Sequence, residues 1–176
     1  KIVATGGGWY ATRNIGTGTH TVNAGGTAQF NNAHGFGVDP GGRAAVVAGG
    51  NLIFNAENAM SSFSMTGGSV TGSGEMRLGS ITIPINASTG GSSIAVGLNL
   101  AYGSPTLNVS NGTAAVDLLV SGGIYNTGGF TKSGTGFMKL SGTGTYSGTT
   151  TISAGTLQLA GGSLGGGTVT VASAAT

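Results

Sequence analysis

Residues 128–159 read GGFTKSGTGFMKLSGTGTYSGTTTISAGTLQL and hold the most regular pattern in the chain. The segment contains two short apolar-polar-apolar runs separated by glycine, serine and threonine. Side chains of a strand alternate between its two faces, so the apolar residues of each run share one face. Neither run is long enough to be stable alone, because an isolated strand pair is marginal in water. The residues predicted to form a core with neighbouring strands are Met138, Leu140, Leu157 and Leu159.

Similar runs recur along the whole chain. Their last residues lie at intervals of 24, 24, 22, 20, 20 and 19, at Phe30, Phe54, Leu78, Leu100, Val120, Leu140 and Leu159. A quasi-period of about 20 residues with a strand in each unit is typical of solenoids. We therefore predict a single all-β solenoid over residues 1–176, with roughly 20–24 residues per turn. A β-sandwich is the alternative, since its strands lie 8–12 residues apart and further apolar runs lie between these markers.

Two asparagines directly follow the first two marker runs. Asn31 follows Phe30, and Asn55 follows Phe54. Asparagine tolerates the positive φ of a tight corner. We expect Asn31 and Asn55 to occupy the same corner on adjacent turns, with their side-chain amides hydrogen-bonded along the axis.

Composition narrows the class of protein. Glycine makes up 38 of 176 residues and charged residues only 6%, which first suggests disorder. A hydrophobic share of 38% with only 3 prolines argues instead for folded β-structure. The frequent glycines disfavour helices, and no apolar run is long enough for a transmembrane helix. The net charge of +2 is scattered rather than patched, and cysteine is absent. We therefore expect neither a nucleic-acid partner nor a thiolate metal site.

Residues 128–159 resemble the autotransporter-associated β-strand repeat found in passenger regions of bacterial surface proteins. That pattern contains a glycine pair, Leu-Thr-Lys, Gly-x-Gly, Leu-x-Leu-Ser-Gly, Asn-x-Tyr-x-Gly, Thr-x-Val and Ala-Gly-Thr-Leu. Departures are mild: Phe130 and Met138 replace leucine, Ile152 replaces valine and Gly144 replaces asparagine. The positions that match the pattern are Gly128, Gly129, Thr131, Lys132, Gly134, Gly136, Leu140, Ser141, Gly142, Tyr146, Gly148, Thr149, Ala154, Gly155, Thr156 and Leu157.

This resemblance implies a right-handed parallel β-helix that is exported and displayed on the bacterial cell surface or outside the cell. The match is strong over residues 128–159, loose over 50–176 and only stylistic over 1–49. The secretion barrel that usually follows such a passenger is missing. We therefore expect the chain to be a fragment, or one module, of a longer surface protein.

Four carboxylates are candidates for chemistry: Asp39, Glu57, Glu75 and Asp117. Glu57 and Glu75 are about one turn apart, so a solenoid could bring them together. Such a pair could serve glycoside hydrolysis or help hold calcium. The favoured interpretation is two solvated glutamates, with Glu75 beside Arg77 on the same face. We therefore predict no catalytic residue.

The histidines and glycine-rich runs are also weak site candidates. His20 and His34 have no third ligand nearby in sequence, so we expect ordinary surface or corner histidines rather than a metal site. The runs GGGWY at 6–10 and GSLGGGTV at 162–169 lack the phosphate-loop lysine and a following helix. We interpret both runs as corners. No cofactor or metal is predicted.

The outer face is rich in hydroxyl and amide groups. Phe137 and Tyr146 are candidates for exposed aromatic residues, which would suit carbohydrate contact or lateral packing. Asn86, Asn108 and Asn111 begin Asn-x-Ser/Thr triplets, which we regard as coincidental.

Three functions follow from these features. We favour a non-catalytic structural or adhesive solenoid outside the cell. A carbohydrate-active β-helix enzyme or a carbohydrate-binding module is the alternative. The third is assembly into a filament, because a solenoid has unpaired backbone at both ends. The expected partners are other copies or turns of the solenoid stacked end to end, and carbohydrate or surface matrix.

Overall fold

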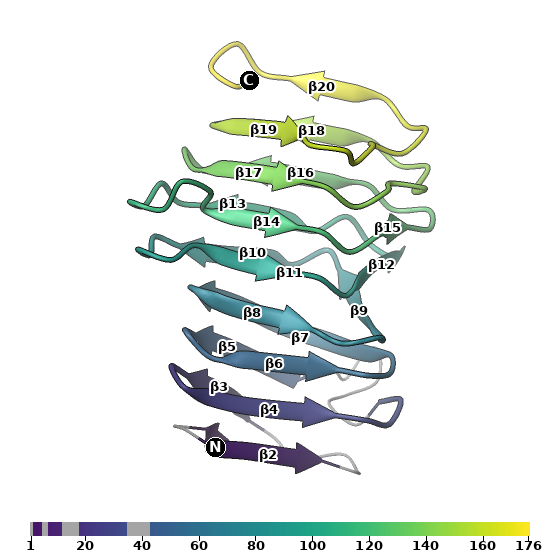
Figure 1. The fold of residues 1–176 in the computed structure, drawn as a ribbon. Coiled ribbons are helices and arrows are strands. Elements are labelled where there is room, and N and C mark those ends of the chain that lie inside the picture. Colours follow the sequence, from purple (N-terminus) through teal and green to yellow (C-terminus); the bar gives the residue numbers. More distant parts are fainter. Residues whose placement is uncertain (1, 5–6, 12–17, 35–42) are drawn as a thin grey trace.

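The computed structural model describes residues 2–4, 7–11, 18–34 and 43–176. These residues form twenty strands and no helix. The chain climbs through about seven stacked turns, and strands of successive turns pair in parallel (Figure 1). The nearer strands in Figure 1 run from left to right as the chain rises, so the coil is right-handed. The predicted parallel β-solenoid is confirmed, and the β-sandwich alternative is wrong.

Most turns contribute one strand to each of two long ladders. The first ladder contains, in order, β1 (Ile2–Ala4), β3 (Thr19–Asn23), β5 (Arg43–Ala48), β7 (Asn58–Thr66), β10 (Thr82–Asn86), β13 (Thr106–Val109), β16 (Phe130–Ser133), β18 (Thr150–Ile152) and β20 (Val169–Val171). The second contains β2 (Gly7–Ala11), β4 (Gly26–Phe30), β6 (Asn51–Phe54), β8 (Gly68–Thr71), β11 (Ser92–Ile94), β14 (Leu118–Val120), β17 (Phe137–Leu140) and β19 (Thr156–Leu159).

A third, shorter ladder exists only in the middle turns. The long strand β7 pairs with β10 through its C-terminal half and with β9 (Glu75–Gly79) through its N-terminal half. From β9 the ladder continues to β12 (Gly97–Tyr102) and β15 (Ile124–Tyr125). The first sheet therefore forks at β7, and the solenoid gains a third face there.

The third face changes how the marker runs stack. Phe30 lies in register with Phe54 on the second ladder, as predicted. Leu78, however, lies in register with Met60 on the third ladder, and Leu100 belongs to β12 on the same ladder. The regularly spaced marker residues therefore lie on different faces: Phe54 is on the second ladder, whereas Leu78 and Leu100 are on the third. Residues in register on the second ladder lie 18 (Leu52 and Val70) to 26 (Ile94 and Val120) positions apart.

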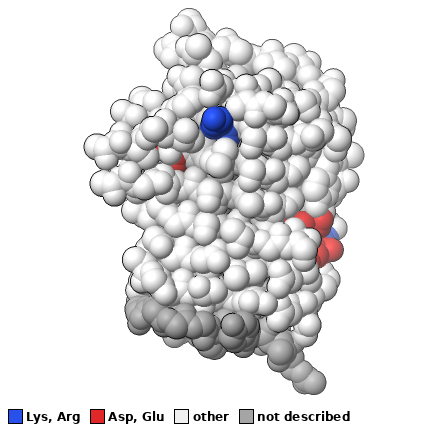
Figure 2. Space-filling model, in the orientation of Figure 1, with Lys and Arg blue, Asp and Glu red and all other residues white. Residues whose placement is uncertain are grey.

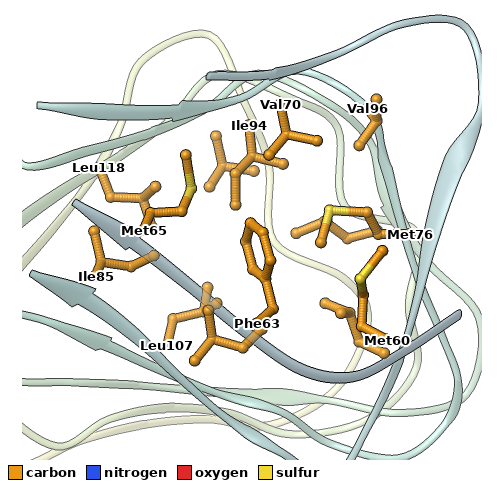
Figure 3. Packing of buried hydrophobic residues seen from close by; sticks show 14 of the residues in the cluster. Met60, Phe63, Met65, Val70, Met76, Ile85, Ile94, Val96, Leu107 and Leu118 are labelled. Atoms are coloured by element: carbon orange, nitrogen blue, oxygen red, sulfur yellow. The ribbon is translucent and has the colours of Figure 1, made fainter. Parts of the chain in front are cut away.

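The core is a continuous column of apolar side chains from all three faces. In Figure 3, Met65, Ile85 and Leu107 of the first ladder point toward Val70, Ile94 and Leu118 of the second. Met60 and Met76 close the third side. Phe30 and Phe54 stack along the axis, with ring centroids 5.6 Å apart. Met138 and Leu140 are fully buried, as their alternation predicts.

The shared asparagine corner and its axial hydrogen bond are confirmed, but neither Asn31 nor Asn55 has the positive φ expected of it. The Asn55 side-chain amide donates to the side-chain oxygen (Oδ1) of Asn31 at 2.8 Å. On the next turn, the Ser73 amide donates to the Asn55 side-chain oxygen at 3.4 Å. Corner side chains therefore bond along the axis and support the backbone ladders.

The expectations for two residues, Leu159 and Leu157, and for one glycine-rich run need correction. Leu159 was expected in the core, but it is 48% exposed because β19 is the edge strand of its sheet. Leu157 is only partly buried against the core for the same reason. Residues 7–10 of the GGGWY run lie in β2 rather than in a corner, whereas the run at 162–169 does connect β19 to β20.

Candidate functional site

The outer side of the third ladder gathers charged and aromatic residues from neighbouring turns. Asn58 lies in register with Met76, so the preceding residues Glu57 and Glu75 stand on adjacent turns. The solenoid thus brings together the one carboxylate pair that the sequence allowed. Figure 2 shows acidic and basic side chains close together at the right edge, on an otherwise nearly uncharged surface.

Each glutamate is held by hydrogen-bond donors. Arg77 forms an ion pair with Glu57, whose carboxylate also lies 3.9 Å from Nδ1 of His34. Glu75 accepts hydrogen bonds from the Asn99 amide at 2.7 Å and from the Tyr125 hydroxyl. Glu75 and Arg77 lie on the same face of β9, as expected, but Arg77 forms its ion pair with Glu57 on the preceding turn.

Tyr125 reaches Glu75 across an intervening turn. Its ring lies over Gly97, where an added Cβ would be 2.9 Å from the Tyr125 hydroxyl. Burial and the hydrogen bond to Glu75 raise the pKa of Tyr125 well above its ordinary value. The phenol therefore stays protonated and remains a donor to Glu75 at neutral pH.

Tyr102 is turned outward by a β-bulge in β12. Leu98 and Leu100 are buried, so regular alternation would point residue 102 into the core. The register between β12 and β9 instead shifts between Asn99 and Tyr102. As a result Tyr102 is 51% exposed, and the Arg77 guanidinium lies 4.0 Å from its ring centroid. Bulges of this kind re-aim side chains.

Together these residues form one assembly, which we call the third-face cluster. It consists of Glu57, Glu75, Arg77, Asn99, Tyr102 and Tyr125. Asn126 extends it, because its amide donates to the Asn99 side chain at 2.7 Å. Both carboxylates are occupied by donors, and a single tyrosine ring is left open to solvent.

The other predicted candidates lie apart from this cluster, except His34. His20 is buried in β3, contrary to the expected surface or corner position, and burial lowers its pKa. His34 does lie at a corner, with φ of 58°. Asp117 is buried and accepts hydrogen bonds from the amides of Gly112 and Phe137. Asp39 lies outside the described residues. Within the described ranges, no three histidine, aspartate or glutamate residues are grouped to hold a metal ion.

The segment quoted at the outset contains no comparable surface cluster, but two of its polar residues are buried. Lys132 is 0% exposed, and its ammonium donates to the carbonyl oxygens of Ser133 (3.0 Å), Gly134 (2.7 Å) and Ala154 (3.0 Å). Burial lowers the pKa of Lys132 from 10.5 to about 8. These carbonyls belong to two successive turns, so Lys132 ties the turns together from inside.

Tyr146 was expected on the surface and is instead 1% exposed. Its ring packs edge-on against Phe130 at 5.7 Å, and its hydroxyl hydrogen-bonds Thr150. The third ladder ends nearby, where two isolated bridges, Ile124–Gly144 and Thr143–Ser163, stand in place of paired strands. Tyr146 therefore fills core volume where that face has no strand. Phe137 does lie on the outer face but is half-buried.

An open cleft of about 700 Å³ lies away from the third-face cluster. Its walls include the loop at 87–91 and the loop at 110–117, which project from the left side in Figure 1. Glycine, alanine, serine and threonine make up most of its lining, and no charged or aromatic side chain contributes. This cleft has no group suited to acid–base chemistry.

Comparison with known protein families identifies one repeat in the C-terminal part of the chain. Residues 130–159 match the passenger-associated-transport-repeat. The match spans β16 to β19 and confirms the predicted resemblance to the autotransporter-associated repeat. Neither curated proteins nor solved structures gave a match. The passenger-associated-transport-repeat and the β-solenoid together fit an autotransporter passenger-like protein. Within the described residues, no helix has the length and apolar character needed to cross a membrane.

Sequence reasoning found the glutamates but missed their partners. Glu75 and Arg77 share a face as expected, but the ion pair of Arg77 is with Glu57, 20 residues away in the sequence. Tyr102 and Tyr125 gave no signal, because alternation alone points Tyr102 inward and Tyr125 lies 50 residues from Glu75. The inward position of Lys132 was readable, since it is two residues after Phe130 in a strand.

Proposed function

We propose that this chain is a non-catalytic structural segment of a passenger displayed on a bacterial surface. The observation that carries the proposal is the passenger-associated-transport-repeat at 130–159, built into an uninterrupted solenoid. In such a protein, stacked turns provide length and stiffness, because the parallel ladders join each turn to the next along the axis.

The state of the two glutamates supports a non-catalytic role. A glycosidase needs one protonated acid and one ionised carboxylate facing a substrate. Here Glu57 is paired with Arg77, and Glu75 accepts from Asn99 and Tyr125. These bonds engage both carboxylates within the protein, so neither is free to face a substrate.

Labelling of intact cells tests the display proposal. Antibodies raised against this chain should bind intact cells of the source bacterium, and external protease should remove the signal. Labelling only after the cells are permeabilised would contradict it. Polysaccharide cleavage that is lost in Glu57→Gln and Glu75→Gln would contradict the non-catalytic part.

Self-association is a second candidate function. Of the four large apolar side chains exposed in the described part, Leu159, Val169 and Val171 lie on the last two strands. β19 and β20 are also edge strands with unpaired backbone on one side. We propose that, in the isolated chain, a second copy stacks head to tail on this end and continues both parallel ladders. A contact of this type does not close on itself and therefore produces filaments.

Sedimentation of the isolated chain tests the stacking proposal. The wild-type chain should form larger species as its concentration rises, and Val171→Glu should remain monomeric because a charge would be buried at the junction. Thr113→Glu, on an exposed loop, is the matched control and should still associate. A monomer at every concentration would rule out this contact.

A further inference from the structure

Tyr102 stands out among the exposed side chains. Away from the last two strands, it is the one large apolar side chain that is exposed in the described ranges. A β-bulge is needed to turn it outward, since regular alternation would bury it. A bulge that re-aims a side chain is a built feature, often found near functional sites. Its exposure therefore calls for a role on the surface.

The ring of Tyr102 is held in place from behind. The Arg77 guanidinium lies against one face of the ring at 4.0 Å, and Glu57 of the preceding turn holds Arg77 by an ion pair. The Arg77 side chain is only 13% exposed, so the support is largely buried. A ring fixed before binding loses little conformational entropy when a ligand arrives.

Polar side chains lie on the same strand as Tyr102, on the strands paired with it and at the adjoining corners. Asn99 and Glu75 lie on the same ladder, and exposed Asn126 lies on the next turn. Ser80 and Ser104 are exposed at the adjoining corners, where the Ser80 hydroxyl accepts from the Ser104 amide at 3.2 Å. Carboxylate, amide and hydroxyl groups around one rigid ring can bond hydroxyl groups while the ring contacts C–H groups.

We propose that Tyr102 and its surroundings bind a neutral polysaccharide. The C–H face of a sugar ring carries partial positive charge and stacks on the negative face of the tyrosine ring. The sugar hydroxyls then reach the amides of Asn99 and Asn126. Because the solenoid is long and the surface open, the site suits a chain that runs across several turns rather than a small enclosed molecule.

The charge pattern favours a neutral ligand over a charged one. The Arg77 guanidinium already lies on one face of the Tyr102 ring, so a second cation on the open face would gain less from the same ring. An anionic polymer would meet two glutamates and one arginine whose charge is neutralised by Glu57. Neither a cationic nor an anionic ligand therefore gains much binding free energy from this surface.

The proposal deepens the surface-passenger role and rests on it only for the cellular setting. Binding can be measured on the isolated chain, wherever that chain is located in the cell. A failure to bind polysaccharide would therefore leave the display proposal intact, and a failure of surface labelling would leave binding intact.

Affinity electrophoresis tests the inference. The chain is run in acidic native gels that contain hydroxyethyl cellulose, laminarin, galactomannan or dextran, with alginate as the anionic comparison. We expect at least one neutral polysaccharide to retard the chain. Tyr102→Ala should weaken this affinity by about tenfold or more, and Tyr102→Phe should keep it within about threefold, since stacking needs the ring and not the hydroxyl.

Leu159→Ala is the matched control, because Leu159 is similarly exposed but lies on the edge strand β19. This variant should bind like the wild type, and melting curves check that all variants fold. Hydrogen exchange of the unmodified chain gives an independent measurement, with slower exchange expected at residues 99–103 when the polysaccharide is bound. The proposal would be overturned if no neutral polymer retarded the chain, or if alginate alone did so. Equal retardation of Tyr102→Ala and Leu159→Ala would also overturn it.

Discussion

At the scale of single residues, Lys132 shows how the repeat uses a polar side chain inside the core. A buried ammonium is costly unless its donors are all satisfied. Three carbonyl oxygens at 2.7 to 3.0 Å satisfy this one. Lys132 therefore acts as a cross-link between turns, a role that alternation within β16 does not reveal although it does predict the inward position.

Replacement of Lys132 by methionine should destabilise the protein by about 3 kcal/mol, because buried carbonyls lose their donor. Urea denaturation measures the free energy of unfolding. Lys139→Met is the matched control, since Lys139 lies on the outer face of β17 and should change stability by no more than about 0.5 kcal/mol. Equal effects of the two substitutions would contradict the cross-link.

The lowered pKa of Lys132 also predicts a pH dependence. The folded value is about 8 and the unfolded value 10.5, so between these the unfolded chain binds more protons. The free energy of unfolding should therefore rise with pH across that interval. The difference between wild type and Lys132→Met, measured by urea denaturation from pH 7 to 10.5, isolates this group. A difference that stays flat or falls with rising pH would contradict the burial of a charged lysine.

At the scale of elements, glycine at the corners permits close contact between turns. A Cβ added at Gly148 would lie 2.3 Å from the Gly129 amide nitrogen, and one at Gly167 would lie 2.0 Å from the Gly148 oxygen. The backbones of three turns therefore approach one another through a column of glycines. Close packing between the backbones of successive turns explains the high glycine content better than a need for backbone flexibility does.

A pair of glycine variants tests this packing. Gly148→Ala should destabilise by about 2 kcal/mol, because the neighbouring backbone must move. Gly166→Ala should change stability by less than about 0.5 kcal/mol, since nothing lies within 4 Å of its added Cβ. Thermal unfolding compares the two variants directly. Similar losses for both would show that corner glycines serve backbone conformation rather than close packing.

At the scale of the whole molecule, stability should vary along the axis. Inner turns are paired on both sides, while β19 and β20 are paired on one side only. In a solenoid the stability is approximately a sum of contributions from turns and their interfaces. Hydrogen exchange should therefore show the slowest amides in β10 to β14 and fast exchange in β20. Uniform protection from β5 to β20 would instead indicate a single cooperative unit.

The sequence by itself determined the solenoid, its repeat and most of its core. Alternation fixes which side of a strand faces inward, and it correctly placed Met138 and Leu140. Quasi-periodic spacing indicates stacked turns, and it correctly stacked Asn31 on Asn55. These features are local, because each depends on neighbouring residues or on a spacing of about one turn.

Only the tertiary structure decided which faces and partners come together. The fork at β7 moved Leu78 and Leu100 to a third face, and a bulge reversed the direction of Tyr102. Tyr146 became buried because its turn lacks a strand on that face. The physical reason is that strand pairing tolerates turns of 18 to 26 residues. Spacing therefore predicts that turns stack, whereas loop length and bulges decide where each side chain points.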